Sequence, residues 1–301
     1  MKKILSYVVK NAFILFMLVA IIASDLYFTY NNPFVGVDMF KPDDFEITQY
    51  HNPEKVWDKV LFGNSTVVSA YRQDLSQSGY VNLGIDCGKI TDLESMLKKG
   101  HIKVGSTLAI GMNYLTFYDD FDTNPSYIWH KKWYQPIAYF HRDKLFSAIE
   151  AIGIRLKNGH EHPFTGYYHY PMEKSVYYGN LTKEQLDVKQ EIYRERYYCL
   201  NDNEFDDNFR ALGEVAEFCK ENNIKLYTFW MPWNPEAEYP ELCEKLKSRA
   251  EEVLKDYNVE IYDLTNQMSA GYFHDTGHIE FEKGSPVFTE IFDNMAKEWQ
   301  E

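Results

Sequence analysis

Short apolar runs that alternate with helix-like segments constrain the fold of this chain most strongly. Turns with Gly, Asn or Asp bound most of the runs, and most are followed by a segment of helical character. The candidate strands are 56–62, 80–85, 104–112, 224–231 and 259–263. The candidate helices are 66–77, 91–99, 206–222, 241–257 and 285–300. This alternation predicts an α/β fold with a parallel sheet in a three-layer body, because parallel strands need helical crossovers that cover both faces.

The alternation is interrupted once, over residues 114–204. This segment is dense in Tyr, His and Trp, and only 144–158 has the pattern of a helix. We interpret it as an insertion or cap over the edge of the sheet formed by the carboxyl ends of the strands, where its aromatic side chains would shape a groove. The body then consists of 56–113 and 205–301. Residues 31–55 are rich in Pro, Asn and Asp without a period and are predicted to be a lead-in linker.

The amino terminus has the composition of a membrane segment. A short basic stretch precedes the unbroken apolar run 12–23, and the apolar character continues to about residue 30. We predict an uncleaved single-pass anchor over 1–30, because no small-residue cleavage site follows the run. The positive-inside rule places Lys2, Lys3 and Lys10 in the cytoplasm and the body outside the membrane. A cleaved signal peptide and a buried helix of a cytosolic protein are the alternatives.

The charge of the chain argues against a nucleic-acid partner, and its cysteine spacing argues against a zinc site. The net charge is −14, and three of the 31 basic residues precede Asp25, where no acidic residue occurs, so the rest of the chain carries −17. Such a surface repels phosphate backbones, which argues against a nucleic-acid partner. The four cysteines include no C-x-x-C pair, which argues against a zinc site. We predict no particular disulfide and no cofactor.

Four short blocks carry the most specific signal. Gly-Asn-Ser at 63–65 follows the first candidate strand, Asn-Leu-Gly at 82–84 ends the second, and Gly-Met-Asn at 111–113 ends the third. Asp-Thr-Gly-His at 275–278 lies near the carboxyl terminus. Parallel strands present their carboxyl ends at one sheet edge, so these blocks are expected to converge. In order and position they resemble the four blocks of the SGNH (GDSL-like) hydrolases.

The residue types at these blocks suit nucleophilic catalysis. A serine hydroxyl needs a base within hydrogen-bond reach and a third group that orients the base, and Ser65, His278 and Asp275 match these roles. The backbone amides of Ser65 and Gly84 and the side-chain amide of Asn113 would then bind the oxyanion.

Two departures separate the blocks from the family pattern. Asn64 stands where the family has Asp, and Tyr114 follows Asn113 where the family has Asp. Each block also has a purely structural interpretation. Residues 63–65 can form a turn with a helix N-cap, Gly84 a tight turn, and 275–278 a loop that starts a helix.

Other candidate sites are weaker. His-Glu-His at 160–162 with His169 has ligand types that bind a metal, but a solvated loop in the insertion is the favoured interpretation. The acidic residues at 119–122 lack an EF-hand pattern and are interpreted as a surface turn. We predict no metal site.

An exported SGNH-like body on one membrane anchor resembles the DltD-like branch of the family. That resemblance implies an acyltransferase or esterase that modifies cell-envelope polymers, as in teichoic-acid D-alanylation or polysaccharide O-acylation. It also implies a multi-pass membrane O-acyltransferase as partner. The alternatives are a non-catalytic assembly subunit of such a system and a polysaccharide deacetylase.

Overall fold

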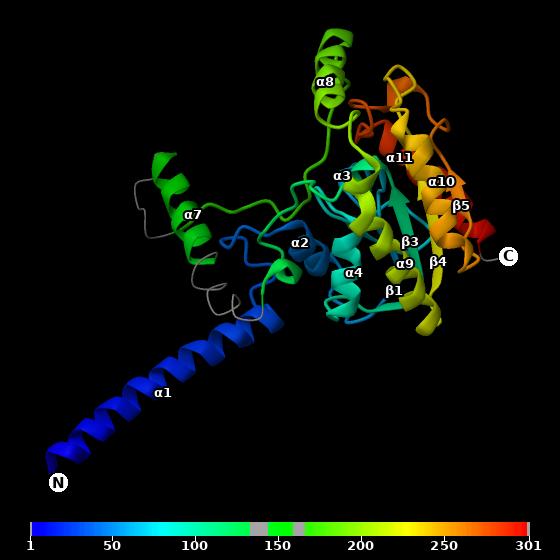
Figure 1. Ribbon diagram of the computed structural model, residues 1–301. Helices are drawn as coiled ribbons and strands as arrows, with labels where there is room; N and C mark the ends of the chain where they lie inside the picture. The colour runs from blue at the N-terminus through cyan, green and yellow to red at the C-terminus, as the bar shows by residue number, and fades with distance from the viewer. Residues whose placement is uncertain (1, 133–143, 159–165, 300–301) are drawn as a thin grey trace. The chain divides into compact units, whose positions relative to one another are not determined.

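The chain forms two compact units (Figure 1). The computed structural model describes residues 2–132, 144–158 and 166–299. Unit 1 comprises Met1–Tyr50 and Pro125–Glu173, and unit 2 comprises His51–Asn124 and Lys174–Glu301.

Unit 2 is built on a five-stranded, wholly parallel sheet, which confirms the predicted α/β class. Its strands are β1 (Trp57–Gly63), β2 (Tyr80–Gly84), β3 (Val104–Met112), β4 (Lys225–Trp230) and β5 (Ile261–Asp263). The order across the sheet is β2-β1-β3-β4-β5. The order reverses between β1 and β3, and the crevice at such a point is where open α/β sheets bind ligands.

Both faces of the sheet are covered by helices. Leu61, Ala109 and Phe229 share one face and pack in a buried cluster with residues of α3 and α11. Trp230 follows Phe229 and therefore points to the other face, where its ring lies 5.8 Å from that of Phe117. Phe117 in turn stacks on a phenylalanine of α9, so α9 covers that second face.

The helices of unit 2 occupy the segments between and after the strands. They are α3 (Ser65–Ala70), α4 (Ile90–Lys98), α5 (Tyr114–Phe117), α8 (Lys183–Arg196), α9 (Asp206–Glu221), α10 (Leu242–Lys255) and α11 (Gly284–Glu298), with 3₁₀ turns η3 (Asp202–Phe205) and η4 (Ala270–Tyr272). The helix expected over 66–77 is shorter than predicted, because Tyr71 is extended and the Arg72 amide donates to Thr289 Oγ1 at 2.9 Å.

Unit 1 contains α1 (Lys2–Asn31), α2 (Asp44–His51), the 3₁₀ turn η1 (Ile128–His130) and α7 (Leu145–Lys157). The stretch Val9–Phe28 of α1 is apolar and long enough to cross a membrane. The linker prediction for 31–55 missed α2. That helix starts with a capping box in which the Glu46 amide donates to Asp43 Oδ1 at 2.9 Å and the Asp43 amide donates to Glu46 Oε2.

Candidate active site

The predicted blocks converge at the carboxyl edge of the sheet. Ser65 begins α3 directly after β1, and Asn113 directly follows β3, the neighbouring strand. Gly63 permits the sharp passage from β1 into α3, because a Cβ at this position would lie 2.2 Å from Val67 Cγ2. The end of β1 therefore places the Ser65 hydroxyl at the point where the strand order reverses.

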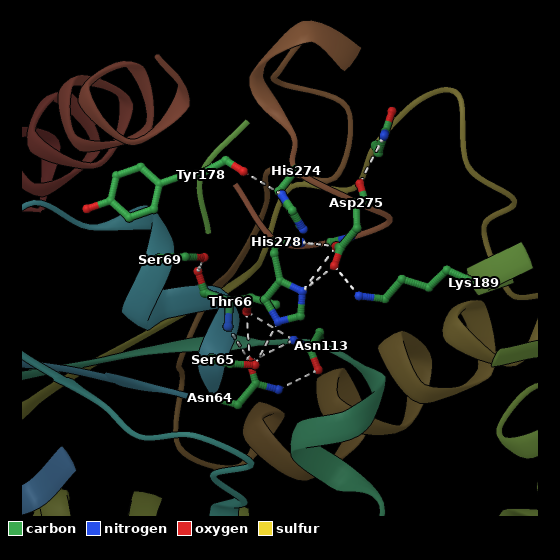
Figure 2. Close-up of polar contacts among 12 residues, drawn as sticks. Asn64, Ser65, Thr66, Ser69, Asn113, Tyr178, Lys189, His274, Asp275 and His278 are labelled. Atoms are coloured by element: carbon green, nitrogen blue, oxygen red, sulfur yellow. Dashed lines mark hydrogen bonds and ion pairs between the residues drawn. The ribbon is translucent and has the colours of Figure 1, made fainter. Parts of the chain in front are cut away.

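A continuous chain of hydrogen bonds joins Ser65, His278 and Asp275 (Figure 2). Ser65 Oγ lies 2.8 Å from His278 Nε2, and His278 Nδ1 lies 2.8 Å from Asp275 Oδ2. The serine and the histidine are 213 positions apart in the sequence. These distances lie in the range in which a base activates a hydroxyl nucleophile.

Asp275 is a buried carboxylate that stays ionised. Its Oδ1 accepts the backbone amides of Gly277 at 3.0 Å and His278 at 2.8 Å. Burial by itself raises the pKa of this carboxyl, but His278 and the Lys189 ammonium more than offset it, so the pKa lies well below its ordinary value. An ionised carboxylate can only accept, so His278 Nδ1 carries the proton and Nε2 is free to accept the proton of Ser65.

The loop that carries Asp275 and His278 is held from outside as well. Asn234, four residues after β4, donates from Nδ2 to the Asp275 carbonyl at 2.9 Å, and its amide donates to the Thr276 carbonyl. The His274 amide donates to the His278 carbonyl at 2.8 Å and closes the turn. The orientation of the imidazole is therefore set by backbone contacts on both sides of the loop.

The residues around Ser65, which form the nucleophile side of the candidate site, include a buried network of side-chain amides. Asn64 is the N-cap of α3, and its Oδ1 accepts the Thr66 amide at 3.0 Å. The side-chain amides of Asn64 and Asn113 pair reciprocally, with N–O distances of 3.0 and 3.1 Å. Asn113 Oδ1 also accepts the Leu115 amide and thereby caps α5. Both asparagines are nearly inaccessible to solvent.

Two of the three expected oxyanion donors are engaged with protein acceptors. The Gly84 amide donates to Asn82 Oδ1 at 2.9 Å. Asn113 Nδ2 donates to Asn64 Oδ1 and to Thr66 Oγ1, each at 3.1 Å. The third donor, the Ser65 amide, is the first amide of α3, where helix geometry provides no intrahelical acceptor.

Sequence reasoning missed Lys189, which forms an ion pair with Asp275 Oδ2 (Figure 2). Lys189 lies on α8, a helix within the predicted insertion that was not expected, because only Leu186 and Gln190 of this helix are buried. The available signal was the capping box, in which Thr182 Oγ1 accepts the Gln185 amide and Gln185 Oε1 accepts the Thr182 amide.

Tyr177 was also missed. Its ring lies against the His278 imidazole, with centroids 4.1 Å apart. Its carbonyl accepts the Phe281 amide at 2.8 Å, which fixes the backbone beside the loop that carries Asp275 and His278. No motif in the sequence distinguishes Tyr177 from the other tyrosines around it.

The weaker candidate sites have structural roles or lie outside the described residues. Residues 160–162 are among those outside. His169 Nδ1 lies 2.8 Å from Asp38 Oδ2. Asp119 caps α9, because its carboxylate accepts the amides of Asp207 and Asn208 at 3.0 Å. Within the part of the chain that the structure describes, no group of three or more His, Cys, Asp or Glu residues could hold a metal ion.

No protein-family model matches this sequence, and no curated protein matches it significantly. The chemistry of the site is therefore argued from geometry. A hydroxyl, an imidazole and an ionised carboxylate in hydrogen-bonded series can transfer a proton from serine to histidine while the serine attacks an acyl carbon.

Proposed function

We propose that this protein is a membrane-anchored, extracytoplasmic serine acyltransferase or esterase that modifies cell-envelope polymers through an acyl-enzyme. The proposal includes membership of the SGNH hydrolases, in their DltD-like branch. The observation that carries it is the hydrogen-bonded series Ser65–His278–Asp275 at the switch point of a parallel sheet. In this role Ser65 is the nucleophile, His278 the general base and Asp275 the group that orients it.

The same three residues serve transfer and hydrolysis. Ser65 Oγ bonds to the acyl carbon while its proton passes to His278 Nε2, which then protonates the leaving group. A hydroxyl of a sugar or polyol, or a water molecule, next gives its proton to Nε2 and attacks the ester. The identity of that second nucleophile alone decides between acyltransferase and esterase.

Helix α1 supports the proposed cellular setting. We infer that Val9–Phe28 crosses the membrane once, with Lys2, Lys3 and Lys10 on the cytoplasmic side and unit 2 outside. An anchored acyl-enzyme can receive its acyl group from a multi-pass membrane O-acyltransferase and deliver it to an envelope polymer. The net charge of −17 beyond residue 24 favours a neutral polymer over an anionic one.

A non-catalytic subunit of an O-acyltransferase complex is the second candidate. One observation favours it, because the Gly84 and Asn113 donors are hydrogen-bonded to protein groups. A scaffold of this kind keeps the fold and the triad without stabilising an oxyanion.

Covalent labelling of the full-length chain tests the proposal. Intact cells that produce the protein are treated with a charged, membrane-impermeant fluorophosphonate, which reacts with activated serines. We expect one labelled serine, Ser65, and complete loss of labelling in Ser65→Ala. Ser69→Ala is the matched control, because Ser69 lies one turn further along α3 and its Oγ donates to the Thr66 carbonyl at 3.3 Å.

Each other outcome removes a defined part of the proposal. Labelling that persists in Ser65→Ala overturns the assignment of the nucleophile. Labelling only after the membrane is permeabilised overturns the extracytoplasmic orientation. An unreactive Ser65 in permeabilised cells, with the protein folded, favours the non-catalytic subunit.

A further inference from the structure

Helix α7 of unit 1 has an exposed apolar face. Its exposed apolar side chains, with exposed fractions between 49 and 65%, are Leu145, Phe146, Ile149 and Leu156. At 3.6 residues per turn these four positions fall within about 100° around the helix axis. On the same arc, and leaving aside its two neighbours, a Cβ at Gly153 would meet no described side chain within 4 Å. A continuous apolar face of this kind marks a contact surface.

The other faces of α7 are held within unit 1. Ala151 is buried, and its carbonyl accepts the Tyr168 amide at 3.0 Å. Glu150 Oε2 accepts the Tyr170 hydroxyl at 3.0 Å, and the Tyr170 amide donates to the Asp38 carbonyl at 2.9 Å. The helix is therefore fixed by its polar and buried side, and its apolar face is the side left exposed.

The amino-terminal end of α7 is joined to the end of α1. Lys144, the residue before α7, forms an ion pair with Glu46, and both side chains are buried. Asn32, the residue after α1, donates from Nδ2 to the same oxygen, Glu46 Oε1, at 2.7 Å. The candidate membrane span ends at Phe28, only four residues before Asn32. One buried carboxylate thus links the start of α7 to the end of the apolar span.

The charges of α7 also suit a lipid surface. Its last turn carries Arg155 and Lys157, and Glu150 is its one acidic residue. Basic side chains beside an apolar face are typical of helices that lie in a membrane interface and attract anionic lipids. A helix held at the end of a membrane span is close to the bilayer whether or not a partner protein is bound, which favours lipid as the occupant of this face.

We propose that α7 is an interfacial helix, whose exposed apolar face lies between the headgroups and acyl chains of the membrane that α1 crosses. The proposal rests on the proposed function only for the membrane crossing by α1, and it does not require an acyl-enzyme. Unit 1 is then attached to the membrane at two places, the α1 span and the α7 face. Two attachments limit the tilt of unit 1 on its anchor.

Spin-label accessibility tests the proposal on the full-length chain in liposomes of phosphatidylcholine and phosphatidylglycerol. A nitroxide is attached to Ile149→Cys in a background with Cys87→Ser and Cys199→Ser, because Cys219 and Cys243 are buried. Collisions of the nitroxide with O₂, which concentrates in lipid, are compared with collisions with a nickel chelate, which stays in water. We expect O₂ to dominate and to place the label about 5–10 Å below the lipid headgroups.

Three further labels complete the experiment. Leu156→Cys is a second probe of the same face, about two turns further along α7. Val188→Cys on α8 is the matched control, because Val188 is an apolar helix residue with an exposed fraction of 63% in unit 2, and we expect it to contact water. Val19→Cys reports on α1, and we expect it near the centre of the bilayer. Thermal unfolding at the wild-type temperature confirms that each labelled protein is folded.

The outcomes separate this proposal from the proposed function. A label at Ile149 or Leu156 that collides mainly with the nickel chelate overturns the role of α7, even if Val19 is in lipid. A Val188 label in lipid overturns it too, since lipid contact is then not specific to α7. A Val19 label in water overturns the membrane anchor of the proposed function instead. If the α7 labels contact water in liposomes but are shielded from both reagents in native membranes, the face binds a membrane protein and not lipid.

Discussion

The two sides of the candidate site are built in opposite ways. On the base side, Asp275 accepts the amides of Gly277 and His278 and the His278 imidazole, all from its own loop. On the nucleophile side, the decisive contact joins Asn64 and Asn113, which are 49 positions apart. A local pair such as Asp275 and His278 can be predicted from the spacing of the two residues. A long-range pair such as Asn64 and Asn113 depends on which polar groups the fold brings within hydrogen-bond distance.

The two sides also differ in charge. The base loop concentrates charge, because an ionised carboxylate with no exposed surface is stabilised by amides, an imidazole and an ammonium. The nucleophile side is neutral, and its buried amides satisfy one another. Substitution of Asp275 should therefore affect catalysis most, and substitution in the Asn64–Asn113 pair should mainly affect stability.

The largest effect is expected for Asp275→Asn. An amide at this position can donate to His278 Nδ1 and hold the imidazole in the tautomer that cannot accept the Ser65 proton. By the precedent of serine triads, kcat for ester hydrolysis falls by roughly 10⁴-fold. Steady-state assays of p-nitrophenyl acetate hydrolysis measure this loss in kcat.

Asp293→Asn is the control for loss of a buried carboxylate. Asp293 accepts the Ser76 hydroxyl at 2.6 Å and the Gln77 amide at 2.7 Å, away from the triad. We expect it to lower stability and to leave kcat near wild type. If both variants lose activity equally, Asp275 serves folding and not catalysis. The proposed difference between the two sides of the site is then wrong.

Asn64→Asp tests the neutral side and introduces the residue type that SGNH hydrolases have in the first block. The carboxylate cannot donate to Asn113 Oδ1, and Asn113 cannot rotate its amide without losing the cap on α5. Replacing that buried donor with a charged acceptor that faces Asn113 Oδ1 costs about 1–3 kcal/mol in the free energy of unfolding, measured by urea denaturation.

The exposed Asn203 provides a matched control, since Asn203→Asp adds the same charge at the surface and should change stability by less than about 0.5 kcal/mol. An Asn64→Asp protein as stable as wild type contradicts the importance of the amide pair.

The smallest effect is expected for Lys189→Met. Without the ammonium, the pKa of Asp275 rises toward its ordinary value of 3.8. A carboxyl whose folded-state pKa is lowered stabilises the protein above that ordinary value, and this stabilisation is lost as the pH falls. The variant should therefore be less stable by about 1–2 kcal/mol near neutral pH, with a smaller deficit in strong acid.

Activity of Lys189→Met should fall by less than about tenfold, because the Gly277 and His278 amides still hold the carboxylate. Lys183→Met, on the same helix but exposed, controls for loss of charge from α8. Thermal unfolding measured from pH 8 down to about pH 1 distinguishes the two variants, because the deficit shrinks only below the ordinary pKa of Asp275. An unchanged pH dependence in Lys189→Met contradicts a role for this ion pair.

An element of the fold was predictable where the hydrophobic pattern of a segment and the length of that segment indicate the same kind of secondary structure. The strand over Val104–Met112 has the predicted bounds, because its second half, 108–112, is an apolar run of the kind typical of a strand buried on both faces. Helix α8 was not predictable in this way, since it buries little apolar surface and only its capping box signals its start. The early end of α3 depends on Thr289, a distant residue, which no local pattern reveals.

The sequence by itself determined the parallel sheet, the apolar amino-terminal helix, and the local pairing of Asp275 with His278, because each follows from spacing along one segment. Only the tertiary structure decided how the rest of the site is arranged. It placed Lys189 on Asp275 and the Tyr177 ring against the His278 imidazole, and it engaged the Asn113 side-chain amide with Asn64. Hydrogen bonds form between groups that are close in space, and several of those in this site join segments far apart in the sequence.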